Sequence, residues 1–400
     1  MTEFSRLRVA IVHDWLTVYG GAERVLEHML TVLPHADLFS LVDFLPHDSR
    51  AFLRHKHVRT SFIQRLPFAR QKYRNYLALM PLAIEEFNLG DYDLVISSTY
   101  AVAKGVITGP DQLHISYVHS PARYVWDLQH EYFQNAGLNF GVKAWLAKWV
   151  MHRLRMWDVR TANGVDYFLA NSSFIRRRIW KVYRRNASIL YPPVDVQNFG
   201  MCEEKDDFFL TASRMVPYKR IDLIVAAFRH LRNKRLVVIG DGPELSRIKS
   251  MATENVCVLG YQDADTMRHY MQRARAFLFA AQEDFGIVPV EAQACGTPVI
   301  AYGRGGVTES VRGLETERPT GVFFAEPTVE SLIGAIDLFE EHRGRISPFA
   351  CRESASRFAP DRFRAGFASF LRQQLAPLDA PDSALQPASF YEHAVGAAAE

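Results

Sequence analysis

Short apolar runs recur along the chain, and glycine or polar residues follow each of them. They occupy residues 8–13, 93–98, 114–119 and 165–172 in the first half, and residues 208–212, 236–240, 256–262, 276–280 and 298–301 in the second. Continuous apolar runs of this length are typical of strands buried on both faces of a parallel sheet. Helical periodicity lies between several of the runs, so we expect an α/β protein with doubly wound sheets.

A stiff segment separates the two halves. Residues 191–195 have the sequence Tyr-Pro-Pro-Val-Asp, which cannot continue a helix, and the strand–helix pattern starts again at residue 208. We therefore predict two Rossmann-like domains, residues 1–195 and residues 196–357, that face a cleft. Residues 378–400 lose all periodicity and are expected to form a flexible tail.

The composition excludes several classes of protein. An apolar share of 48% and a charged share of 23% are typical of globular chains, and the net charge of +3 gives no argument for nucleic-acid binding. No run of about eighteen apolar residues occurs, and the start lacks a signal-peptide segment, so we expect a cytoplasmic protein. The four cysteines show neither metal-ligand spacing nor a disulfide framework.

Two carboxylates flank the start of a helix in the second half. Glu283 lies in the loop after an apolar run, and Glu291 lies just inside the helix that Pro289 helps to start. A carboxylate accepts two hydroxyl hydrogen bonds, and Gly286 between them allows backbone amides to approach the same ligand. The pair suits a polyol such as a sugar or a ribose. Alternatively, Glu291 is only a favourable negative charge in the first turn of a helix, and Glu283 is only a solvated loop residue.

Two cations precede another helix in this half. Arg214 and Lys219 lie in the loop between the run at 208–212 and the helix that begins at Ile221. Positive side chains at a helix N-terminus oppose the helix dipole, so a structural purpose does not explain them. A bound anion would explain them, because the guanidinium of an arginine can donate two parallel hydrogen bonds to it and a lysine can contribute a compact positive charge. The loop therefore predicts a phosphate site.

Two segments of the first half combine basic and apolar side chains. Residues 62–90 begin basic and become apolar, and residues 142–160 carry cations and aromatic residues at helical spacing. Either segment can rest on an anionic membrane surface, or it can be an ordinary helix with a solvated face and a core face. For residues 142–160 we favour the core helix.

Several of these pieces, in the same order, resemble the retaining glycosyltransferases of family 4, which have the GT-B fold. The resemblance rests on Glu283-x7-Glu291 with Phe285-Gly286 inside it, on residues 296–299 (Gly-Thr-Pro-Val), and on the Pro-Pro-Val-Asp segment. It covers nearly the whole chain to about residue 375. It also implies that the last helix, residues 358–375, crosses back to the first domain.

The resemblance assigns roles to individual residues. It implies that His119, at a strand end, and Glu283 contact the donor hexose beside the reacting carbon and form the catalytic pair. The remaining implied donor contacts are amides near Phe285, Gly286 and Ile287 for the hexose, Glu291 for the ribose, and Gly21, Arg214 and Lys219 for the diphosphate. Asp14 and Arg123 are weaker candidates for contact with the acceptor.

The first half also resembles bacterial mannosyltransferases of polysaccharide and O-antigen assembly, through residues 13–25 and residues 119–127. That implies GDP-mannose, or another nucleoside diphosphate sugar, as the donor, and a lipid-linked saccharide as the acceptor. It is compatible with a protein that lies peripherally on the inner face of the plasma membrane. No metal or cofactor is expected, because fixed cations and amides can stabilise the leaving diphosphate.

Other functions remain as alternatives. A hexosyltransferase of the same family that uses a UDP-sugar needs only a few substitutions in the donor site. A scaffold that binds a nucleotide sugar without turnover is the non-enzymatic alternative. A sugar-nucleotide 2-epimerase is disfavoured by the Glu-x7-Glu arrangement, and a dehydrogenase by the lack of a dinucleotide fingerprint after either first strand.

Overall fold

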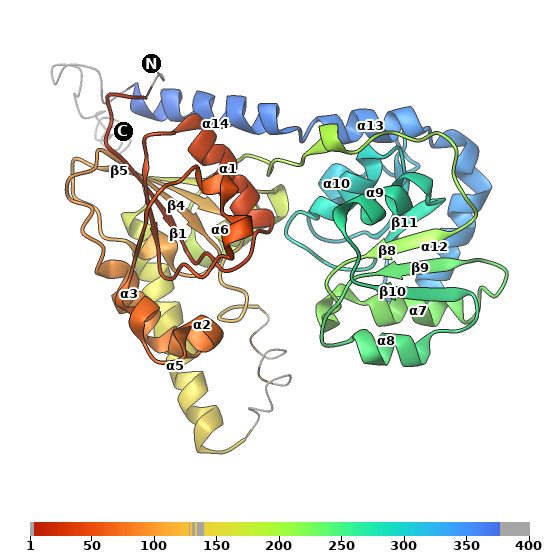
Figure 1. Cartoon of the computed structure of the whole chain (residues 1–400), viewed down its shortest axis with the longest axis horizontal. Helices are drawn as coiled ribbons and strands as arrows, with labels where there is room; N and C mark the ends of the chain where they lie inside the picture. The colour runs from red at the N-terminus through yellow and green to blue at the C-terminus, as the bar shows by residue number, and fades with distance from the viewer. Residues whose placement is uncertain (1–3, 128, 130–132, 134–139, 377–400) are drawn as a thin grey trace, which may run out of the picture.

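The computed structural model describes residues 4–127, 129, 133 and 140–376. Within these residues the two halves of the chain each form a parallel sheet covered by helices (Figure 1). The prediction of an α/β protein with two doubly wound domains is confirmed. The tail predicted for residues 378–400 lies outside the described residues.

The first sheet has seven strands in the described part of the chain, in the order β3-β2-β1-β4-β5-β6-β7, and all pairs are parallel. The strands are β1 Val9–His13, β2 Asp37–Ser40, β3 Val58–Thr60, β4 Leu94–Thr99, β5 Leu113–Val118, β6 Tyr167–Ala170 and β7 Ala187–Ile189. His13 is paired with Ser98, so both residues lie at the carboxyl edge of this sheet. In open α/β sheets this edge is where ligands bind.

The second sheet has six described strands in the order β10-β9-β8-β11-β12-β13, again parallel throughout. The strands are β8 Phe209–Ala212, β9 Leu236–Ile239, β10 Val256–Gly260, β11 Ala276–Phe279, β12 Val299–Tyr302 and β13 Gly321–Phe324. The order reverses between β8 and β11, which makes the carboxyl ends of these strands a topological switch point.

The described α-helices are α1 Gly21–Val32, α2 Ala69–Lys72, α3 Met80–Glu85, α5 Val142–Thr161, α6 Ser173–Tyr183, α7 Ile221–Phe228, α8 Leu245–Met251, α9 Ala264–Arg273, α10 Ile287–Ala294, α11 Val307–Ser310, α12 Val329–His342, α13 Pro348–Ser356 and α14 Pro360–Leu375. Short 3₁₀ helices include η4 Tyr73–Leu79 and η5 Ala103–Gly105. Among the described residues, no helix is both long enough and apolar enough to cross a bilayer.

Four strands have no counterpart in the sequence prediction, namely β2, β3, β7 and β13. Each has only three or four residues. β3, β7 and β13 lie at the edges of their sheets, where one side of a strand has no neighbour. β2, β3 and β7 each include polar residues within three or four positions, so their apolar signal is weak, whereas residues 322–325 around β13 form an apolar run that the prediction missed.

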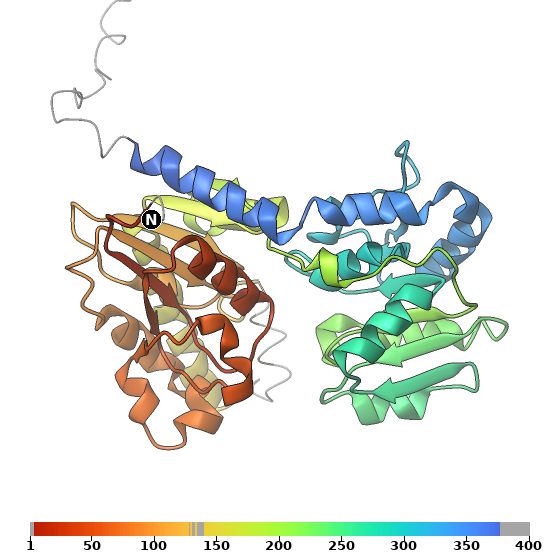
Figure 2. The same cartoon turned by 45° about the horizontal axis from the view of Figure 1, so that its top comes forward.

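Helix α14 returns from the second half and lies along the first domain (Figures 1 and 2). Its buried face presents Phe363, Phe367 and Leu371, which are at most 2% exposed and pack in the core of the first sheet together with α1. These residues recur at spacings of four, as expected for one face of a helix. The chain therefore crosses between the domains twice, once at residues 190–199 and once before α14.

Helix α5 differs from the expectation of a core helix. Its aromatic residues Trp145 and Trp149 are 67% and 46% exposed, whereas its buried residues are Ala144, Leu154 and Asp158. Asp158 forms a buried ion pair with Lys104, with 2.8 Å between Oδ1 and Nζ. The helix is thus anchored by a narrow inner face, and periodicity alone could not tell which apolar stripe faces the protein.

Candidate functional site

A cavity of about 760 Å³ lies between the two domains and contains His119. Its wall includes Gly21 and His119 from the first domain and residues 283–288 from the second. We call it the His119 pocket. It brings together most of the residues that the sequence singled out, although they come from distant parts of the chain.

A chain of buried polar groups holds His119 in place. Its Nε2 lies 2.8 Å from Oγ of Ser98, which also lies 3.1 Å from Nδ1 of His13. Nε2 of His13 lies 3.3 Å from Oε1 of Glu23, and the backbone carbonyl of His119 accepts a hydrogen bond from Nδ2 of Asn171 at 2.9 Å. His13 and Ser98 are fully buried. The imidazole of His119 is therefore fixed on one side and borders the cavity on the other.

Burial keeps two histidines of the first sheet neutral. Loss of hydration lowers the pKa of His119 to about 3, with His13 as a further cause, and lowers the pKa of His114 to about 4. A neutral imidazole next to the reacting centre can accept or donate a hydrogen bond without adding positive charge. It keeps this state throughout the physiological pH range.

These shifts predict a loss of stability in mild acid. The unfolded chain protonates both histidines below a pKa of about 6.5, but the folded chain does not, so the unfolding free energy falls as the pH falls. Between pH 7 and pH 5 fully buried His114 should account for about 2 kcal/mol. Urea unfolding at several pH values measures how steeply the unfolding free energy changes with pH in the wild type and in the H114Q variant. Replacement of the exposed His57 by Gln is the control. Parallel pH profiles for H114Q and wild type would contradict the prediction.

The Glu283 loop is held by a glycine-rich loop after β12. The backbone carbonyl of Glu283 accepts a hydrogen bond from the amide of Gly306 at 2.9 Å. A Cβ atom at Gly305 would lie 2.4 Å from that carbonyl oxygen, and one at Gly306 would lie 2.3 Å from the carbonyl oxygen of Asp284. Only glycine permits so close an approach. The glycine-rich loop after β12 therefore positions Glu283. Oε1 of Glu283 forms an ion pair with Lys219.

Phe285 is a structural anchor. It is 3% exposed, and its ring lies 5.1 Å from Phe358 and 5.9 Å from Tyr191, between centroids. These contacts tie the loop to the two segments that cross between the domains. The Phe285 side chain is thus engaged away from the ligand, and only its backbone is available for the predicted contact. Gly286, with φ of 87°, precedes α10 in a conformation that favours glycine.

Two helix N-termini meet at the pocket. Gly21 is the first residue of α1 and Ile287 the first of α10, and a Cβ atom at Gly21 would lie 2.9 Å from Cδ1 of Ile287. Each helix end presents free backbone amides and the positive end of a dipole. The convergence of the two ends favours an anion in the pocket. Gly21 and Ile287 are the residues for which the resemblance implies contacts with the diphosphate and the hexose.

A second cavity of about 360 Å³ adjoins the carboxyl ends of β8, β9 and β10. We call it the Glu291 pocket, and its wall includes Arg214, Asp241, Tyr261 and Glu291. Oε1 of Glu291 accepts a hydrogen bond from Nη1 of Arg24 at 2.7 Å, while its Oε2 has no partner among the described residues.

Arg214 is exposed, and its guanidinium has no ion-pair partner in the described part of the chain. Arg214 and Lys219 do not line one pocket, because Lys219 reaches Glu283 instead. An anion that contacts both must therefore lie between the Glu291 pocket and the His119 pocket.

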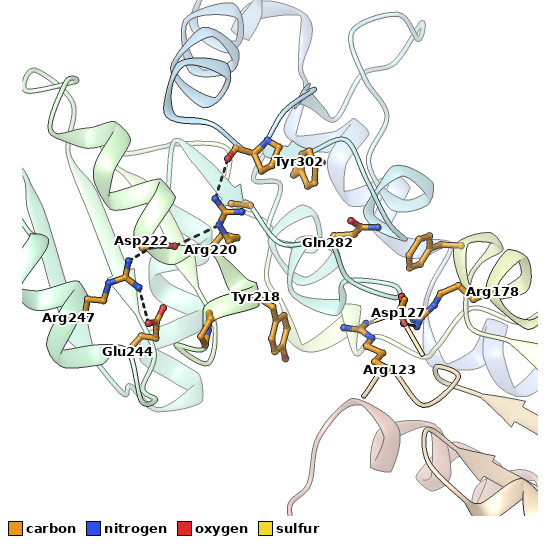
Figure 3. Close-up of a pocket in the computed structure, with 14 residues that line it drawn as sticks. Arg123, Asp127, Arg178, Tyr218, Arg220, Asp222, Glu244, Arg247, Gln282 and Tyr302 are labelled. Atoms are coloured by element: carbon orange, nitrogen blue, oxygen red, sulfur yellow. Dashed lines mark hydrogen bonds and ion pairs between the residues drawn. The ribbon is translucent and has the colours of Figure 1, made fainter. Parts of the chain in front are cut away.

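A third cavity, of about 570 Å³, is lined by residues of both domains (Figure 3). Four arginines line it, and carboxylates accompany all of them. Arg178 pairs with Asp127 and Asp284, and Arg247 pairs with Asp222 and Glu244. Because the charges balance, this cavity is a poor site for a free diphosphate.

Two predicted contacts take different positions. Asp14 is fully buried, and its carboxylate accepts hydrogen bonds from four successive backbone amides, of residues 100–103, at 2.5–2.8 Å. It therefore cannot orient an acceptor hydroxyl, and that prediction is wrong, because the loop after β4 already uses both oxygens. Arg123 lines the His119 pocket and pairs with Asp284.

The sequence prediction missed several residues that shape the site. Ser98 contacts His119 and Arg24 contacts Glu291, while Glu23 supports His119 indirectly through His13. Asp284 pairs with two arginines of the first domain. Ser98 was visible as a hydroxyl at a strand end. The contacts of Arg24 and Asp284 join the two domains, and a single sequence carries no signal for such a pairing.

No group of three or more metal-ligating side chains occurs among residues that the structure describes. Asp91 and Asp93, which match the pattern Asp-x-Asp, lie beside Arg8 at the opposite end of β4 from the pocket.

Two family models together match most of the chain. The model "Glycosyltransferase Family 4" matches residues 19–198, and "Glycosyl transferases group 1" matches residues 199–358. A GDP-Man:Man(3)GlcNAc(2)-PP-Dol alpha-1,2-mannosyltransferase of Xenopus tropicalis is 29% identical over 50% of this chain and 47% of its own length. A GDP-mannose-dependent alpha-(1-6)-phosphatidylinositol monomannoside mannosyltransferase of Mycobacterium tuberculosis is 28% identical over 53% of this chain and 63% of its own length. The chain thus matches about half to less than two thirds of these relatives.

A solved structure shows the same architecture. The crystal structure of Anabaena HepE in complex with UDP aligns with a TM-score of 0.65 over 92% of this chain and 100% of that chain, at 18% identity. This likeness concerns the fold. The two family models show the family, and the paired sheets, the crossing helix α14 and this likeness show the fold. The chain is therefore a member of glycosyltransferase family 4 with the GT-B fold.

Proposed function

We propose that the protein is a retaining hexosyltransferase that moves mannose from GDP-mannose to a lipid-linked saccharide. The observation that carries this proposal is the position of the Glu291 pocket next to the His119 pocket, with two helix N-termini at the junction. A nucleoside in the first pocket and a hexose in the second would place the diphosphate at those helix ends. Arg214 and Lys219 would flank it.

In the proposed reaction the bond between the anomeric carbon and the diphosphate breaks, and a bond to the acceptor oxygen forms on the same face. The acceptor proton passes to the leaving diphosphate oxygen. Negative charge grows on the diphosphate, where helix amides, Arg214 and Lys219 would stabilise it without a metal. Positive charge grows on the sugar, near the carboxylate of Glu283, and neutral His119 holds the sugar without opposing that charge.

The donor and acceptor are inferred from two relatives. Both are named as GDP-mannose-dependent or GDP-mannose enzymes, and their printed acceptors carry a lipid joined through phosphate. An acceptor of this kind would bring the protein to the inner face of the plasma membrane, in the assembly of a bacterial polysaccharide or O-antigen. The exposed aromatic side of α5 and the basic segment 62–90 would lie on the anionic surface.

The test is transfer of labelled mannose from GDP-mannose to a lipid extract of the producing bacterium, with the anomeric configuration of the product determined by NMR. We expect label in the lipid fraction with the configuration of the donor retained. Label from UDP-sugars alone would keep a hexosyltransferase but replace the donor. A protein that binds nucleotide sugars and transfers none would be a scaffold.

A further inference from the structure

One side of the His119 pocket has an apolar wall built from three distant segments. Trp15 and Met80 are at most 9% exposed, and Leu77, Ala147 and Met151 complete the wall. Leu77 belongs to η4, while Ala147 and Met151 lie on α5, and Leu77 and Met151 pack in the same small cluster. The hydroxyls of a free sugar would lose water at such a wall without gaining partners, so the wall suits an apolar group better than a saccharide.

The guanidinium of Arg74 lies next to this apolar wall. Arg74 lines the pocket, and its guanidinium lies 6.0 Å from the centre of the Trp15 ring and 5.5 Å from that of Tyr73. Its Nε donates to the hydroxyl of Tyr73 at 3.1 Å. In the described part of the chain, its two Nη groups have neither a hydrogen-bond acceptor nor a carboxylate partner. This fork is therefore available to an anion, and phosphate matches its geometry.

The outer face of α5 continues the apolar character to the molecular surface. Val142, Trp145 and Leu146 are 83%, 67% and 53% exposed, on the same helix whose inner face contributes Ala147 and Met151 to the pocket. Leu82, which follows Met80 in α3, is 62% exposed. An apolar chain can thus pass from the surface to the pocket along residues of α5 and α3.

We propose that this wall and Arg74 form the site for the acceptor's lipid carrier: Leu77, Met80 and Met151 bind its apolar chain, and Arg74 binds the phosphate that joins the chain to the saccharide. The proposal rests on the proposed transfer to a lipid-linked acceptor and names the residues that recognise it. The chain would occupy the end of the His119 pocket that Leu77, Met80 and Met151 line, and the donor hexose the end lined by residues 283–288. The accepting sugar would then lie a short distance from its carrier, beside Glu283.

Octyl phosphate is the probe, measured by calorimetry below its aggregation concentration. Octyl phosphate should bind more tightly than butyl phosphate, by up to about fourfold per buried methylene, and more tightly than octyl glucoside or inorganic phosphate. Arg74→Ala should weaken octyl phosphate binding roughly tenfold to a hundredfold. Arg70→Ala is the matched control, because Arg70 is exposed in the same segment but does not line the pocket.

A second pair of variants tests the apolar wall. Leu77→Asp should abolish octyl phosphate binding, whereas Leu79→Asp, on the exposed side of the same 3₁₀ helix, should leave it unchanged. GDP binding by each variant reports whether the fold and the donor site are intact, so a failure of the proposed donor would appear separately. The proposal is overturned if octyl phosphate does not bind, or if Arg74→Ala and Leu77→Asp bind it as well as their controls.

Discussion

The Glu283→Gln variant should turn over roughly 10²–10³-fold more slowly than the wild type while remaining folded. The carboxylate of Glu283 borders the His119 pocket and pairs with Lys219, and its loop is fixed by contacts with Gly305 and Gly306. The amide keeps the shape but removes the negative charge that would stabilise the sugar in the transition state. It also leaves Lys219 without its partner.

The measurement is the initial rate of transfer, with the thermal midpoint recorded for the same sample. Glu254→Gln is the control, since Glu254 is exposed and has no contact in the described structure. We expect the loss in kcat rather than in KM, because the charge matters most when the sugar becomes positive. A Glu283→Gln enzyme with a normal rate would remove Glu283 from the reaction.

Removal of the Asp14 carboxylate should have the largest effect on stability. The Asp14→Ala variant should lose about 4 kcal/mol or more of unfolding free energy, because the amides of residues 100–103 would lose their acceptors in a buried position. Burial also raises the pKa of Asp14, although the amides of residues 100, 102 and 103 and the neighbouring His13 oppose that rise. The residue holds the loop after β4 against the end of β1.

Denaturant unfolding of Asp14→Ala measures this loss. Asp93→Ala is a suitable comparison, because Asp93 accepts a single backbone hydrogen bond, from the amide of Arg8, at the surface, and its loss should cost about 1 kcal/mol or less. A stable Asp14→Ala protein whose defect lies only in turnover would reverse the assignment and restore Asp14 to the acceptor site.

The sequence predicted the fold well because its central strands are buried on both faces. β4, β5, β8 and β11 are largely apolar in sequence and buried at every position, as expected for a covered parallel sheet, and the Pro-Pro segment interrupts the pattern once. β2, β3 and β7 mix polar and apolar residues and carry a weaker signal. The sequence also did not predict which side of α5 is buried, because apolar residues lie on more than one side of the helix. The Lys104–Asp158 ion pair lies on the side that is buried.

Candidate site residues could be predicted where they follow a strand or lie at the start of a helix. His119, Arg214, Glu283 and Glu291 all lie at such points and border the two adjoining pockets. Asp14 also follows a strand, yet it serves the backbone of a neighbouring loop. Position along the chain therefore locates the edge of a sheet, while the partners of each side chain depend on loops and on the second domain.

The most direct test of the central claim is calorimetric titration of the purified protein with GDP, UDP and ADP in the absence of metal ions. We predict that GDP binds and that Arg214→Ala weakens it roughly tenfold to a hundredfold, because a charged hydrogen-bond donor to phosphate is lost. Arg229→Ala, at the C-cap of α7 and outside the pockets described, should bind as the wild type does. Absence of binding by all three nucleotides, or affinity that Arg214→Ala leaves unchanged, would contradict the account.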